Sequence, residues 1–449
     1  MKLLVAGAGA GKTTSMAEEV LSRYREVEDG KIIYVITYTN AARDQIRNKI
    51  IEQHGDIPKQ VKVETSHVFL LQELIFPFYH LLYDQRYSSV SAINLPVNQG
   101  YRAKKLKELR EGNIVHVQEV TNISSHVLYG KSNDKKLIKE RRKRIISIIG
   151  NYLDSIFIDE AQDIDKYLSK IIDVFHTNGF YLHLVGDPKQ DLRARNEFRR
   201  LLGKYPQFVK YKKENHRCPI SHVKLSNKYI LEQEKQEWQT EEVGVLKYFY
   251  ESDVNLVEFI KDGTWDYIYI YQKNERFITD TNDVNAHEDL LIYELKMLIK
   301  RTSAEDNQID KITFILLRLI KKNLKKKNNW SIIKKIGEVL SLSLELTKQD
   351  KARLYDALEA NKEAAKTEGI LVNSIDKVKG LEGNCCLFIL TTELSEYFFR
   401  NKIELNKMMN YLYVALTRSK KELIILITTE VEEKYGREWI DNKFKQLLK

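Results

Sequence analysis

The feature that most constrains the fold lies at the start of the chain, where an apolar run leads into a glycine-rich loop. Leu3-Leu4-Val5-Ala6 predicts a short buried strand, and Gly7-Ala8-Gly9-Ala10-Gly11-Lys12-Thr13-Thr14 predicts a loop that turns into a helix. Small residues let backbone N–H groups close around an oxyanion, Lys12 can reach the β- and γ-phosphates of a nucleotide, and Thr13 can bind Mg²⁺. The pattern therefore predicts a phosphate-binding loop, with Ala6 at its first position in place of the usual glycine. A glycine-rich turn followed by a chance Lys-Thr is the alternative.

Length and composition set broad limits on the protein. The chain has 449 residues, more than one hydrophobic core usually supports, so two or more domains are expected. Its formal net charge of +10 suits a polyanionic partner such as nucleic acid, although many basic proteins bind none. The three cysteines, Cys218, Cys385 and Cys386, lack metal-ligand spacing and indicate buried thiols in a reducing compartment. The N-terminal apolar segment is too short for a signal peptide and no apolar stretch approaches a membrane span, so a cytoplasmic protein is expected.

Short apolar runs alternate with segments of helical periodicity along most of the chain. The runs are Ile32 to Ile36, Ser155 to Ile158, Tyr181 to Val185, Tyr267 to Tyr271, Cys385 to Leu390 and Leu423 to Ile427. This alternation predicts parallel sheets in α/β layers. Two regions, from about Tyr83 to Ile149 and from about Asp280 to Lys366, read as helical insertions rich in Lys and Arg. The basic runs within them, 139–144 and 321–327, could equally be solvated helix faces.

Polar residues follow two of the predicted strands. Ile156-Phe157-Ile158 is followed by Asp159-Glu160, where Asp159 would hold Mg²⁺ and Glu160 would orient and deprotonate the attacking water. Asp163 or Asp165 could instead simply cap the next helix. After the following strand comes Gln190, whose amide could sense a γ-phosphate, although Asp187-Pro188 before it could be only a turn.

Seven strings in this order resemble motifs I, Ia, II, III, IV, V and VI of the UvrD/Rep-like superfamily 1A helicases. They are Ala6 to Thr13, Thr37-Tyr38-Thr39-Asn40-Ala41-Ala42, Asp159-Glu160-Ala161-Gln162-Asp163, Gly186-Asp187-Pro188-Lys189-Gln190, Asn215-His216-Arg217, Lys379-Gly380-Leu381-Glu382 and Tyr413-Val414-Ala415-Leu416-Thr417-Arg418. The strings span the whole chain. Seven matches in the family's order make coincidence a poor explanation.

The resemblance implies an α/β protein with two RecA-like P-loop NTPase domains that contain parallel sheets, each carrying a mainly helical insertion, and ATP between them. The implied boundaries are residues 1–82 and 150–205 for domain 1A, 83–149 for insertion 1B, 206–279 and 367–449 for domain 2A, and 280–366 for a reduced insertion 2B. Arginines that reach the γ-phosphate from the opposite domain stabilise its developing charge, which couples hydrolysis to domain closure.

Roles for individual residues follow from their positions in the motifs. The resemblance implies catalytic roles for Lys12, Glu160, Gln190, Arg217 and Arg418, adenine stacking for His216, and ribose contact for Glu382 with close backbone approach at Gly380. It also implies that Thr37, Thr39, Asn40 and His67 line a single-strand track, since hydroxyl and amide groups can bind phosphates without reading sequence. For Thr37 and His67, a purely structural hydrogen bond is the alternative.

Three departures from the family pattern affect what is expected. The phosphate loop starts at residue 6 with no Gln-bearing adenine-recognition segment before it, so GTP or dATP could also serve. After Gln190, relatives usually continue with aromatic residues that stack on bases, whereas this chain continues with Asp191-Leu192-Arg193-Ala194-Arg195-Asn196-Glu197-Phe198. Arg193 and Arg195 could contact phosphates or stack on bases instead. Motif V has Ser374-Ile375-Asp376 where relatives tend to have Thr-x-His.

The compact size and several local strings resemble, more narrowly, the helicase subunits of Gabija anti-phage defence systems, which act with a separate OLD-like nuclease. The expected function is a DNA-stimulated, Mg²⁺-dependent NTPase that translocates 3′ to 5′ on single-stranded DNA and unwinds duplex. The alternative is a nucleotide-switched sensor of DNA ends or single strands that regulates a partner nuclease with little unwinding. RNA also remains open as the track. A metabolic P-loop kinase is disfavoured because it would not need two distant arginines.

Overall fold

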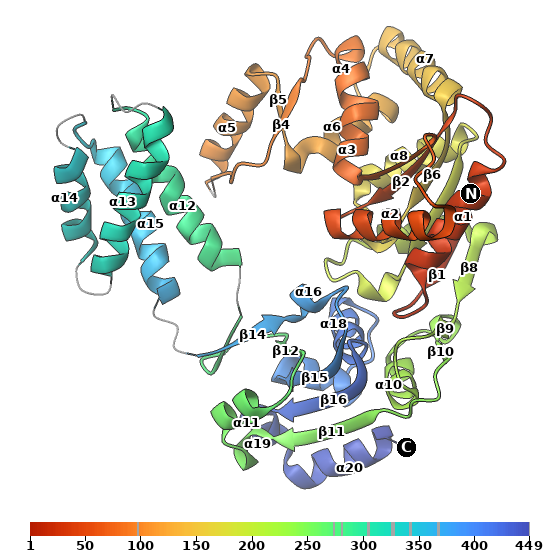
Figure 1. Ribbon diagram of the computed structural model, residues 1–449, viewed down its shortest axis with the longest axis vertical. Helices are drawn as coiled ribbons and strands as arrows, with labels where there is room; N and C mark the ends of the chain where they lie inside the picture. Colours follow the sequence, from red (N-terminus) through yellow and green to blue (C-terminus); the bar gives the residue numbers. More distant parts are fainter. Residues whose placement is uncertain are drawn as a thin grey trace. The chain divides into compact units, whose positions relative to one another are not determined.

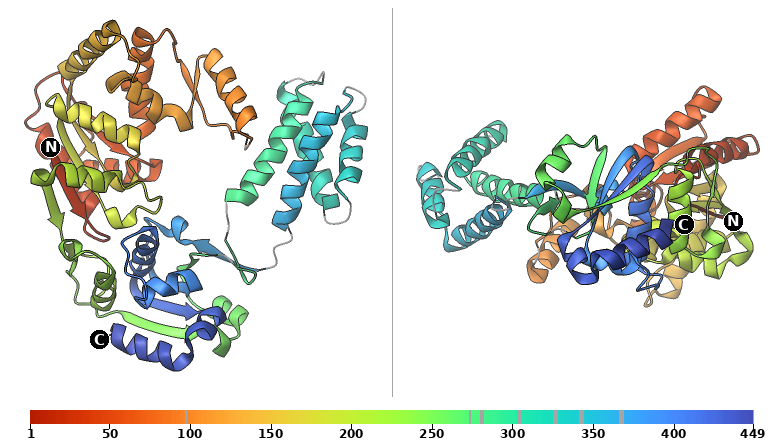
Figure 2. Two further views of the ribbon diagram at one scale, coloured as in Figure 1. Left: turned by 180° about the vertical axis from the view of Figure 1, so that it is seen from behind. Right: turned by 90° about the horizontal axis from the view of Figure 1, so that it is seen from below.

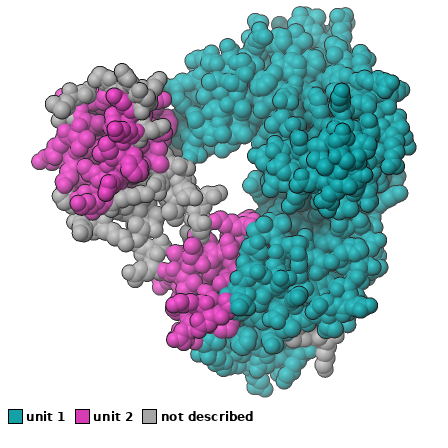
Figure 3. Space-filling model, in the orientation of Figure 1, with its two compact units in different colours: residues 1–254, 264–267, 378–449 teal, residues 255–263, 268–377 magenta. Residues whose placement is uncertain are grey.

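The computed structural model describes residues 1–96, 98–272, 274–279, 282–302, 306–324, 328–340, 344–365 and 369–448. The chain divides into two compact units (Figure 3): residues 1–254, 264–267 and 378–449 form the first, and residues 255–263 and 268–377 form the second. Each unit is described by itself below. Within the described ranges, no helix combines the length and apolar character that crossing a membrane requires.

The first unit begins with a parallel sheet of six strands in the order β3-β2-β6-β7-β1-β8 (Figure 1). The strands are β1 (Lys2–Ala6), β2 (Ile32–Thr37), β3 (Val61–Thr65), β6 (Leu153–Ile158), β7 (Tyr181–Gly186) and β8 (Val209–Lys212). Alternate residues of β2 face opposite sides: Ile33 and Val35 join one core cluster, while Tyr34 and Ile36 join another. Burial on both faces explains why these strands read as continuous apolar runs.

Helices cover both faces of this sheet. Met16 and Val20 of α1 (Lys12–Tyr24) and Ile46 of α2 (Asn40–His54) pack in one cluster, while α8 (Lys166–Thr177) and α9 (Glu197–Lys204) contribute to the other. The remaining short elements of this region are η3 (Ala161–Asp163), η4 (Pro188–Gln190) and η5 (Pro206–Phe208).

A mainly helical insertion lies between β3 and β6. It comprises α3 (Ser66–Leu70), η1 (Leu71–Ile75), α4 (Phe76–Leu82), β4 (Ser89–Ser91), α5 (Gln99–Glu111), β5 (Ile114–His116), η2 (Val117–Glu119), α6 (Val120–Leu128) and α7 (Lys136–Tyr152). The basic run 139–144 falls on α7. Arg142 in that run is buried and forms an ion pair with Asp134, whereas Lys139, Arg141, Lys143 and Arg144 are exposed.

The rest of the first unit contains a second parallel arrangement, in which β16 (Ser419–Ile427) pairs with both β11 (Val245–Tyr250) and β15 (Gly383–Leu390). Around it lie α10 (Ile220–Ser226), η6 (Asn227–Tyr229), η7 (Glu232–Glu234), η8 (Glu251–Asp253), α17 (Thr392–Phe398), α18 (Lys407–Leu416), α19 (Thr429–Tyr435) and α20 (Arg437–Leu448). The short strands β9 (Glu214–Asn215) and β10 (Glu237–Trp238) pair in parallel with each other. Leu387, Ile389, Leu423 and Ile425 are fully buried, as expected for central strands.

The second unit combines parallel strands with a helical bundle. Strand β14 (Ile370–Ser374) pairs with β12 (Tyr267–Ile270) and with β13 (Phe277–Thr279), and α11 (Leu256–Asp262) and α16 (Ile375–Val378) complete the strand-containing part. Four helices, α12 (Asn282–Ile299), α13 (Asp306–Leu324), α14 (Asn329–Leu340) and α15 (Lys348–Ala365), pack around buried leucine and isoleucine side chains (Figure 2). The predicted basic run 321–327 lies only partly within the described residues. The predicted α/β fold class, with parallel sheets and mainly helical insertions, is confirmed.

Candidate nucleotide-binding site

The predicted site residues of the first sheet gather at its carboxyl edge. Strand β1 leads into the glycine-rich loop, β6 into Asp159 and Glu160, and β7 into Asp187 and the turn that bears Gln190. Because β7 pairs with both β1 and β6, and all three run parallel, these three loops lie at one end of neighbouring strands. Ligands of open α/β sheets bind at this edge.

The glycine-rich loop presents free backbone donors. Gly9 and Gly11 adopt φ angles of +72° and +68°, which L side chains rarely adopt. Gly11 caps α1 without a side-chain hydrogen bond, so the N–H groups of the first turn, including that of Thr13, remain available to an anion. Ala6, Ala8 and Ala10 are buried, and their small side chains let the backbone of the loop close around an oxyanion.

Lys12, Asp159 and Glu160 form the charged centre of the site. Lys12 Nζ lies 3.7 Å from Glu160 Oε2, and Asp159 Oδ1 accepts a hydrogen bond from the backbone N–H of Glu160 at 2.9 Å. Burial and the Glu160 charge raise the pKa of Asp159, whereas Lys12, acting against burial, holds the pKa of Glu160 below its usual value. Asp159 is thus a buried carboxylate whose pKa is raised by burial and the Glu160 charge more than the Lys12 charge lowers it.

The donor chemistry fits Mg²⁺. This ion prefers oxygen ligands and is usually held by one or two protein oxygens together with phosphate oxygens and waters. The Asp159 carboxylate and the Thr13 hydroxyl are such ligands, and a divalent cation would favour the ionised form of the buried carboxylate. The sequence-predicted pair therefore offers the right atoms.

Two glutamines make hydrogen bonds in the loops after β6 and β7, and one of them, Gln162, connects the two loops. Gln190, the predicted γ-phosphate sensor, donates from Nε2 to Asp187 Oδ2 at 3.0 Å and is almost fully buried. Gln162 donates to the Glu160 carboxylate and accepts a hydrogen bond from the Asp187 backbone N–H at 2.9 Å. Gln162 lies in motif II, but the sequence alone assigned it no role. Its amide links the proposed base to the loop that carries the proposed sensor.

The segment after β8 lies directly against the glycine-rich loop. The backbone N–H of His216 donates to Gly9 O at 2.9 Å, and a Cβ atom at Gly9 would lie 2.5 Å from both Arg217 Cβ and Asn215 Oδ1. Glycine is therefore required at position 9 for space as well as for conformation. The His216 side chain, predicted to stack on adenine, is exposed.

Gln236 and Tyr413 also hold the loop, and sequence reasoning missed both contacts. Gln236 Nε2 donates to Ala8 O at 2.9 Å, while the Ala8 backbone N–H donates to the Tyr413 hydroxyl at 3.1 Å. The Tyr413 hydroxyl in turn donates to Gln236 Oε1 at 2.9 Å, and Asn215 Nδ2 donates to the same oxygen at 3.2 Å. Both backbone polar groups of Ala8 are thus bound by side chains from distant parts of the chain. Tyr413 lies in motif VI, whereas Gln236 lies in none of the seven motifs.

The two predicted arginines have different surroundings. Arg217 forms an ion pair with Glu382, the predicted ribose contact, and Glu382 also pairs with Lys420 at 2.6 Å. Arg418 is fully buried, and its guanidinium donates to Val414 O at 2.9 Å, to Leu381 O at 3.1 Å and to Thr417 Oγ1 at 2.9 Å. Gly380, two residues before Glu382, has a φ angle of +83°.

The four residues predicted to line a nucleic-acid track lie at the carboxyl ends of β2 and β3, which pair with each other. Thr37 is buried and its hydroxyl donates to Thr39 O at 3.1 Å, while the Thr39 side chain accepts from Ala42 N and caps α2. Thr39, Asn40 and His67 are exposed. Thr37 thus makes the purely structural hydrogen bond that was its alternative, and the other three residues are the accessible ones.

Two further contacts join the loops of the first sheet to the C-terminal part of the same unit. Lys379 Nζ contacts both carboxylate oxygens of Asp163 at 2.8 and 2.9 Å, and Asn410 Nδ2 donates to Asp191 O at 3.0 Å. Together with the Ala8 contacts, they place motif I, motif II and the turn after motif III against motif V and α18, the helix that carries motif VI.

A phosphate-binding loop with an adjacent pair of carboxylates, together with a second parallel sheet, is the arrangement typical of RecA-like P-loop NTPases. Residues 1–195 match a protein-family model described as an AAA domain. More narrowly, the chain is 24% identical to the Gabija protein GajB of Bacillus cereus (strain VD045) over 517 aligned residues, covering 99% of this chain and 96% of that protein. These findings confirm the predicted resemblance to UvrD/Rep-like helicases and to the Gabija helicase subunit.

One solved structure is also similar. It is titled "Complex structure of Arterivirus nonstructural protein 10 (helicase) with DNA", and the match has 13% identity and a TM-score of 0.38 over 94% of this chain. The aligned region spans 59% of that protein's chain. The likeness is too distant to support an argument about this protein.

Proposed function

We propose that this protein is a DNA-stimulated, Mg²⁺-dependent NTPase that translocates on single-stranded DNA and unwinds duplex, with ATP as its main fuel. The 3′ to 5′ direction rests on the family resemblance alone. The observation that carries the proposal is the contact between the phosphate loop and distant motifs: Ala8 with Tyr413, and Gly9 with His216. A nucleotide held by this loop would touch both parts of the site, as a motor requires.

In this proposal, each residue near the loop has a defined task. Lys12 binds the phosphates and Glu160 orients and deprotonates the attacking water, a role consistent with its lowered pKa. Mg²⁺, held by Asp159 and Thr13, would neutralise phosphate charge. Gln190 senses the γ-phosphate by exchanging its hydrogen bond with Asp187 for one to the nucleotide.

The remaining predicted residues complete the proposed site. Arg217 and Arg418 stabilise the charge that develops on the departing phosphate. His216 stacks on the base, and Glu382 binds the ribose beside Gly380. Thr37, Thr39, Asn40 and His67 contact the phosphates of the single strand.

We also propose the four-part domain division given by the motifs: 1–82 with 150–205, 83–149, 206–279 with 367–449, and 280–366. The likeness to GajB supports a role in an anti-phage defence complex, with an OLD-like nuclease as the partner and the cytoplasm as the location.

A specific observation favours the alternative of a nucleotide-switched DNA sensor. In the segment after Gln190, the only aromatic residue, Phe198, is buried, and Arg195 donates to Asp163 O. Base stacking contributes about 1 to 3 kcal/mol per base in single-strand binders, so a segment without an exposed ring would grip bases weakly. Such a protein could hydrolyse NTP on DNA without separating strands.

The test measures NTP hydrolysis with and without single-stranded DNA, RNA and blunt duplex, followed by strand displacement on a duplex with a 3′ single-stranded tail. Lys12→Ala is the inactive control. Stimulation by single-stranded DNA together with displacement is the expected result. DNA-stimulated hydrolysis without displacement would select the sensor, and hydrolysis indifferent to all three nucleic acids would refute both readings.

A further inference from the structure

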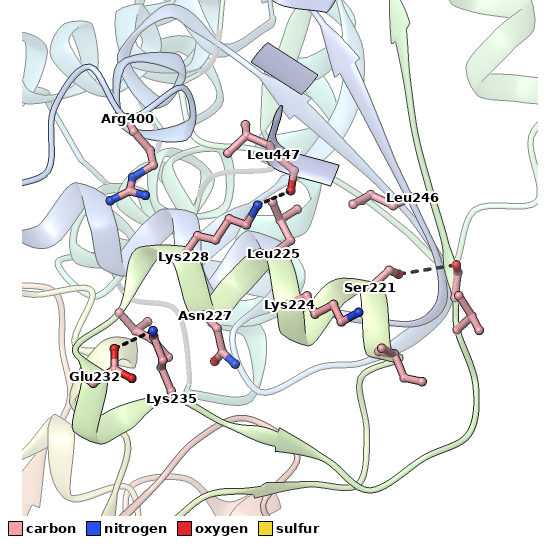
Figure 4. Close-up of a pocket in the computed structure, with 14 residues that line it drawn as sticks. Ser221, Lys224, Leu225, Asn227, Lys228, Glu232, Lys235, Leu246, Arg400 and Leu447 are labelled. Atoms are coloured by element: carbon pink, nitrogen blue, oxygen red, sulfur yellow. Dashed lines mark hydrogen bonds and ion pairs between the residues drawn. The ribbon is translucent and has the colours of Figure 1, made fainter. Parts of the chain in front are cut away.

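A cavity of about 840 Å³ lies in the first unit, away from the residues assigned to the nucleotide site. Its lining includes the apolar side chains of Leu225 of α10, Leu246 of β11 and Leu447 of α20. Figure 4 shows Lys224, Lys228 and Asn227 projecting from α10 and the turn after it, with Arg400 and Leu447 approaching from the C-terminal part of the chain. Four separate segments therefore line the space: residues 220–235, residues 243–246, Arg400 and Leu447.

The charge of the cavity wall is strongly positive. Four cations line it, Lys224, Lys228, Lys235 and Arg400, against one carboxylate, Glu232. Glu232 is already paired with Lys235 at 2.6 Å. Within the described part of the chain, no carboxylate lies at ion-pair distance from the other three. Burial and then the nearby Arg400 charge lower the pKa of Lys228, as expected where positive groups converge without a counter-charge.

Lys228 donates to Leu447 O at 2.7 Å and to Gln446 O at 3.3 Å, and Lys224 lies over the Trp238 ring. Lys224 and Arg400 therefore keep a positive charge that no carboxylate among the described residues balances, beside the apolar side chains of the lining. This combination identifies the chemistry of an occupant. Phosphate backbones need charge but gain little from leucine side chains, whereas a peptide with alternating acidic and apolar residues satisfies both. We propose that this cavity is a docking site for an acidic, leucine-containing segment of a partner protein. Carboxylates of the segment pair with Lys224 and Arg400, and its apolar side chains cover Leu225 and Leu246.

The cavity is connected to the phosphate loop by hydrogen bonds. Asn227, which lines the cavity, donates from Nδ2 to Gln236 O at 2.8 Å and accepts from Gln236 N at 2.9 Å. Gln236 then binds Ala8 O through its side chain. A docked segment that displaces Asn227, or Lys235, which directly precedes Gln236 in the chain, therefore shifts Gln236. Gln236 is the residue that holds the phosphate loop through Ala8. This second step, in which docking alters nucleotide turnover, rests on the proposed function.

Docking is tested by fluorescence anisotropy with a labelled 12-residue peptide of alternating Glu and Leu. Two control peptides replace Leu by Ser or Glu by Lys, and a 12-nucleotide single strand is tested as competitor. The cavity variants are Lys224→Glu and Arg400→Glu. The matched control is Lys247→Glu, because Lys247 is exposed next to Leu246 on β11 and alternate strand residues face opposite sides.

We expect the Glu-Leu peptide to bind, each cavity variant to weaken binding about tenfold or more, and Lys247→Glu to bind as the unchanged protein does. The Ser peptide should bind about tenfold more weakly and the Lys peptide not at all. Equal binding by the cavity variants, or by the Ser peptide, would overturn the proposal. Competition by the single strand that is lost in Arg400→Glu would make nucleic acid the occupant and also overturn it.

The link to the loop is measured as NTP turnover with saturating Glu-Leu peptide. A change of about threefold or more in KM or kcat, absent in Arg400→Glu, is expected. Peptide binding with unchanged turnover would refute the link and leave the docking site standing. If the protein hydrolyses no NTP under any condition, the proposed function fails, while the anisotropy result still decides the docking site.

Discussion

The hydroxyl group of Tyr413 accepts a hydrogen bond from the backbone N–H of Ala8 across 405 residues of sequence. The same hydroxyl donates to Gln236, which binds the carbonyl oxygen of Ala8. The phosphate loop is therefore held at both backbone polar groups of Ala8 by side chains from two distant segments of the unit. Any movement of α18, which carries Tyr413, changes the support of the loop that is proposed to bind phosphate.

Replacing Tyr413 by Phe removes the hydroxyl but keeps the ring. We expect NTP hydrolysis to fall about 5- to 30-fold, since an unpaired buried N–H costs about 1 to 2 kcal/mol in loop positioning. Steady-state kinetics with thermal unfolding would check this. Tyr229→Phe is the matched control, because its buried hydroxyl donates to Phe398 O at 2.7 Å, in another part of the fold. Equal losses of activity in both variants would mean that the effect is general destabilisation.

The phosphate loop could be predicted from sequence because its whole geometry is encoded in eight consecutive residues. Positive φ angles at Gly9 and Gly11 and the helix that begins at Lys12 depend only on local residue types. The contact of Gln236 could not be predicted in this way. It joins residues 228 positions apart, and a lone glutamine before a two-residue strand has no local signal.

The same distinction applies to the arginines. The motif marks Arg418 as a functional residue, but its hydrogen bond to Leu381 O joins residues 37 positions apart and depends on how the two segments pack. The basic run on α7 shows a similar limit, since its charge pattern could not reveal that Arg142 is buried against Asp134. Local pattern predicts the element and the residue type, and packing decides the partner.

Glu160→Gln separates nucleotide binding from chemistry. The substitution keeps the size of the side chain while removing the carboxylate that could deprotonate water, so we expect hydrolysis to fall about 10²- to 10⁴-fold. Nucleotide affinity should stay within a few fold, because Lys12 is then relieved of a neighbouring anion at 3.7 Å. Single-turnover kinetics and nucleotide titration would measure both. Glu433→Gln, an exposed residue on α19, serves as the control.

Asp163 of motif II and Lys379 of motif V form an ion pair, and exchanging their charges tests whether this contact matters for turnover. Each single change, Asp163→Lys or Lys379→Asp, places like charges at about the present separation of 2.8 Å and should reduce turnover. The double variant restores opposite charges. We expect it to recover part of the lost activity, with a coupling energy of about 1 kcal/mol for this half-exposed pair, falling at high salt. Strictly additive losses would show that the pair is incidental.

Substitutions of Arg217 and Arg418 should differ in how much they destabilise the protein, although both arginines are proposed to act on the phosphate. Arg418→Ala removes a fully buried side chain and leaves carbonyl oxygens unpaired, so we expect a loss of about 2 to 4 kcal/mol in unfolding free energy together with lost hydrolysis. Arg217→Ala breaks a partly exposed ion pair and should cost less than about 1 kcal/mol while still slowing hydrolysis. Urea unfolding beside kinetics distinguishes them. Normal turnover in folded Arg217→Ala would contradict its proposed role.

His183 gives the fold a defined response to acid. Its ring lies in the centre of β7, and neither ring nitrogen has a hydrogen-bond partner within the described ranges. Burial and then the Lys2 charge lower the pKa of His183 to about 4, with Glu19, 3.9 Å away, opposing the shift. Between this value and an ordinary histidine pKa of about 6.5, the unfolded chain binds a proton that the folded chain does not.

The contribution of His183 to the free energy of unfolding should therefore be fully present above about pH 6.5. It should be lost as the pH drops towards 4, and the loss should amount to about 3 kcal/mol at most. Urea unfolding at pH 7.5, 6 and 5 would measure the slope. His183→Leu cannot bind the proton in either state, so its stability should vary less with pH whatever its absolute value. His80→Gln, at an exposed position on α4, controls for histidine loss in general. Parallel slopes for the unchanged protein and His183→Leu would show that other groups cause the acid sensitivity.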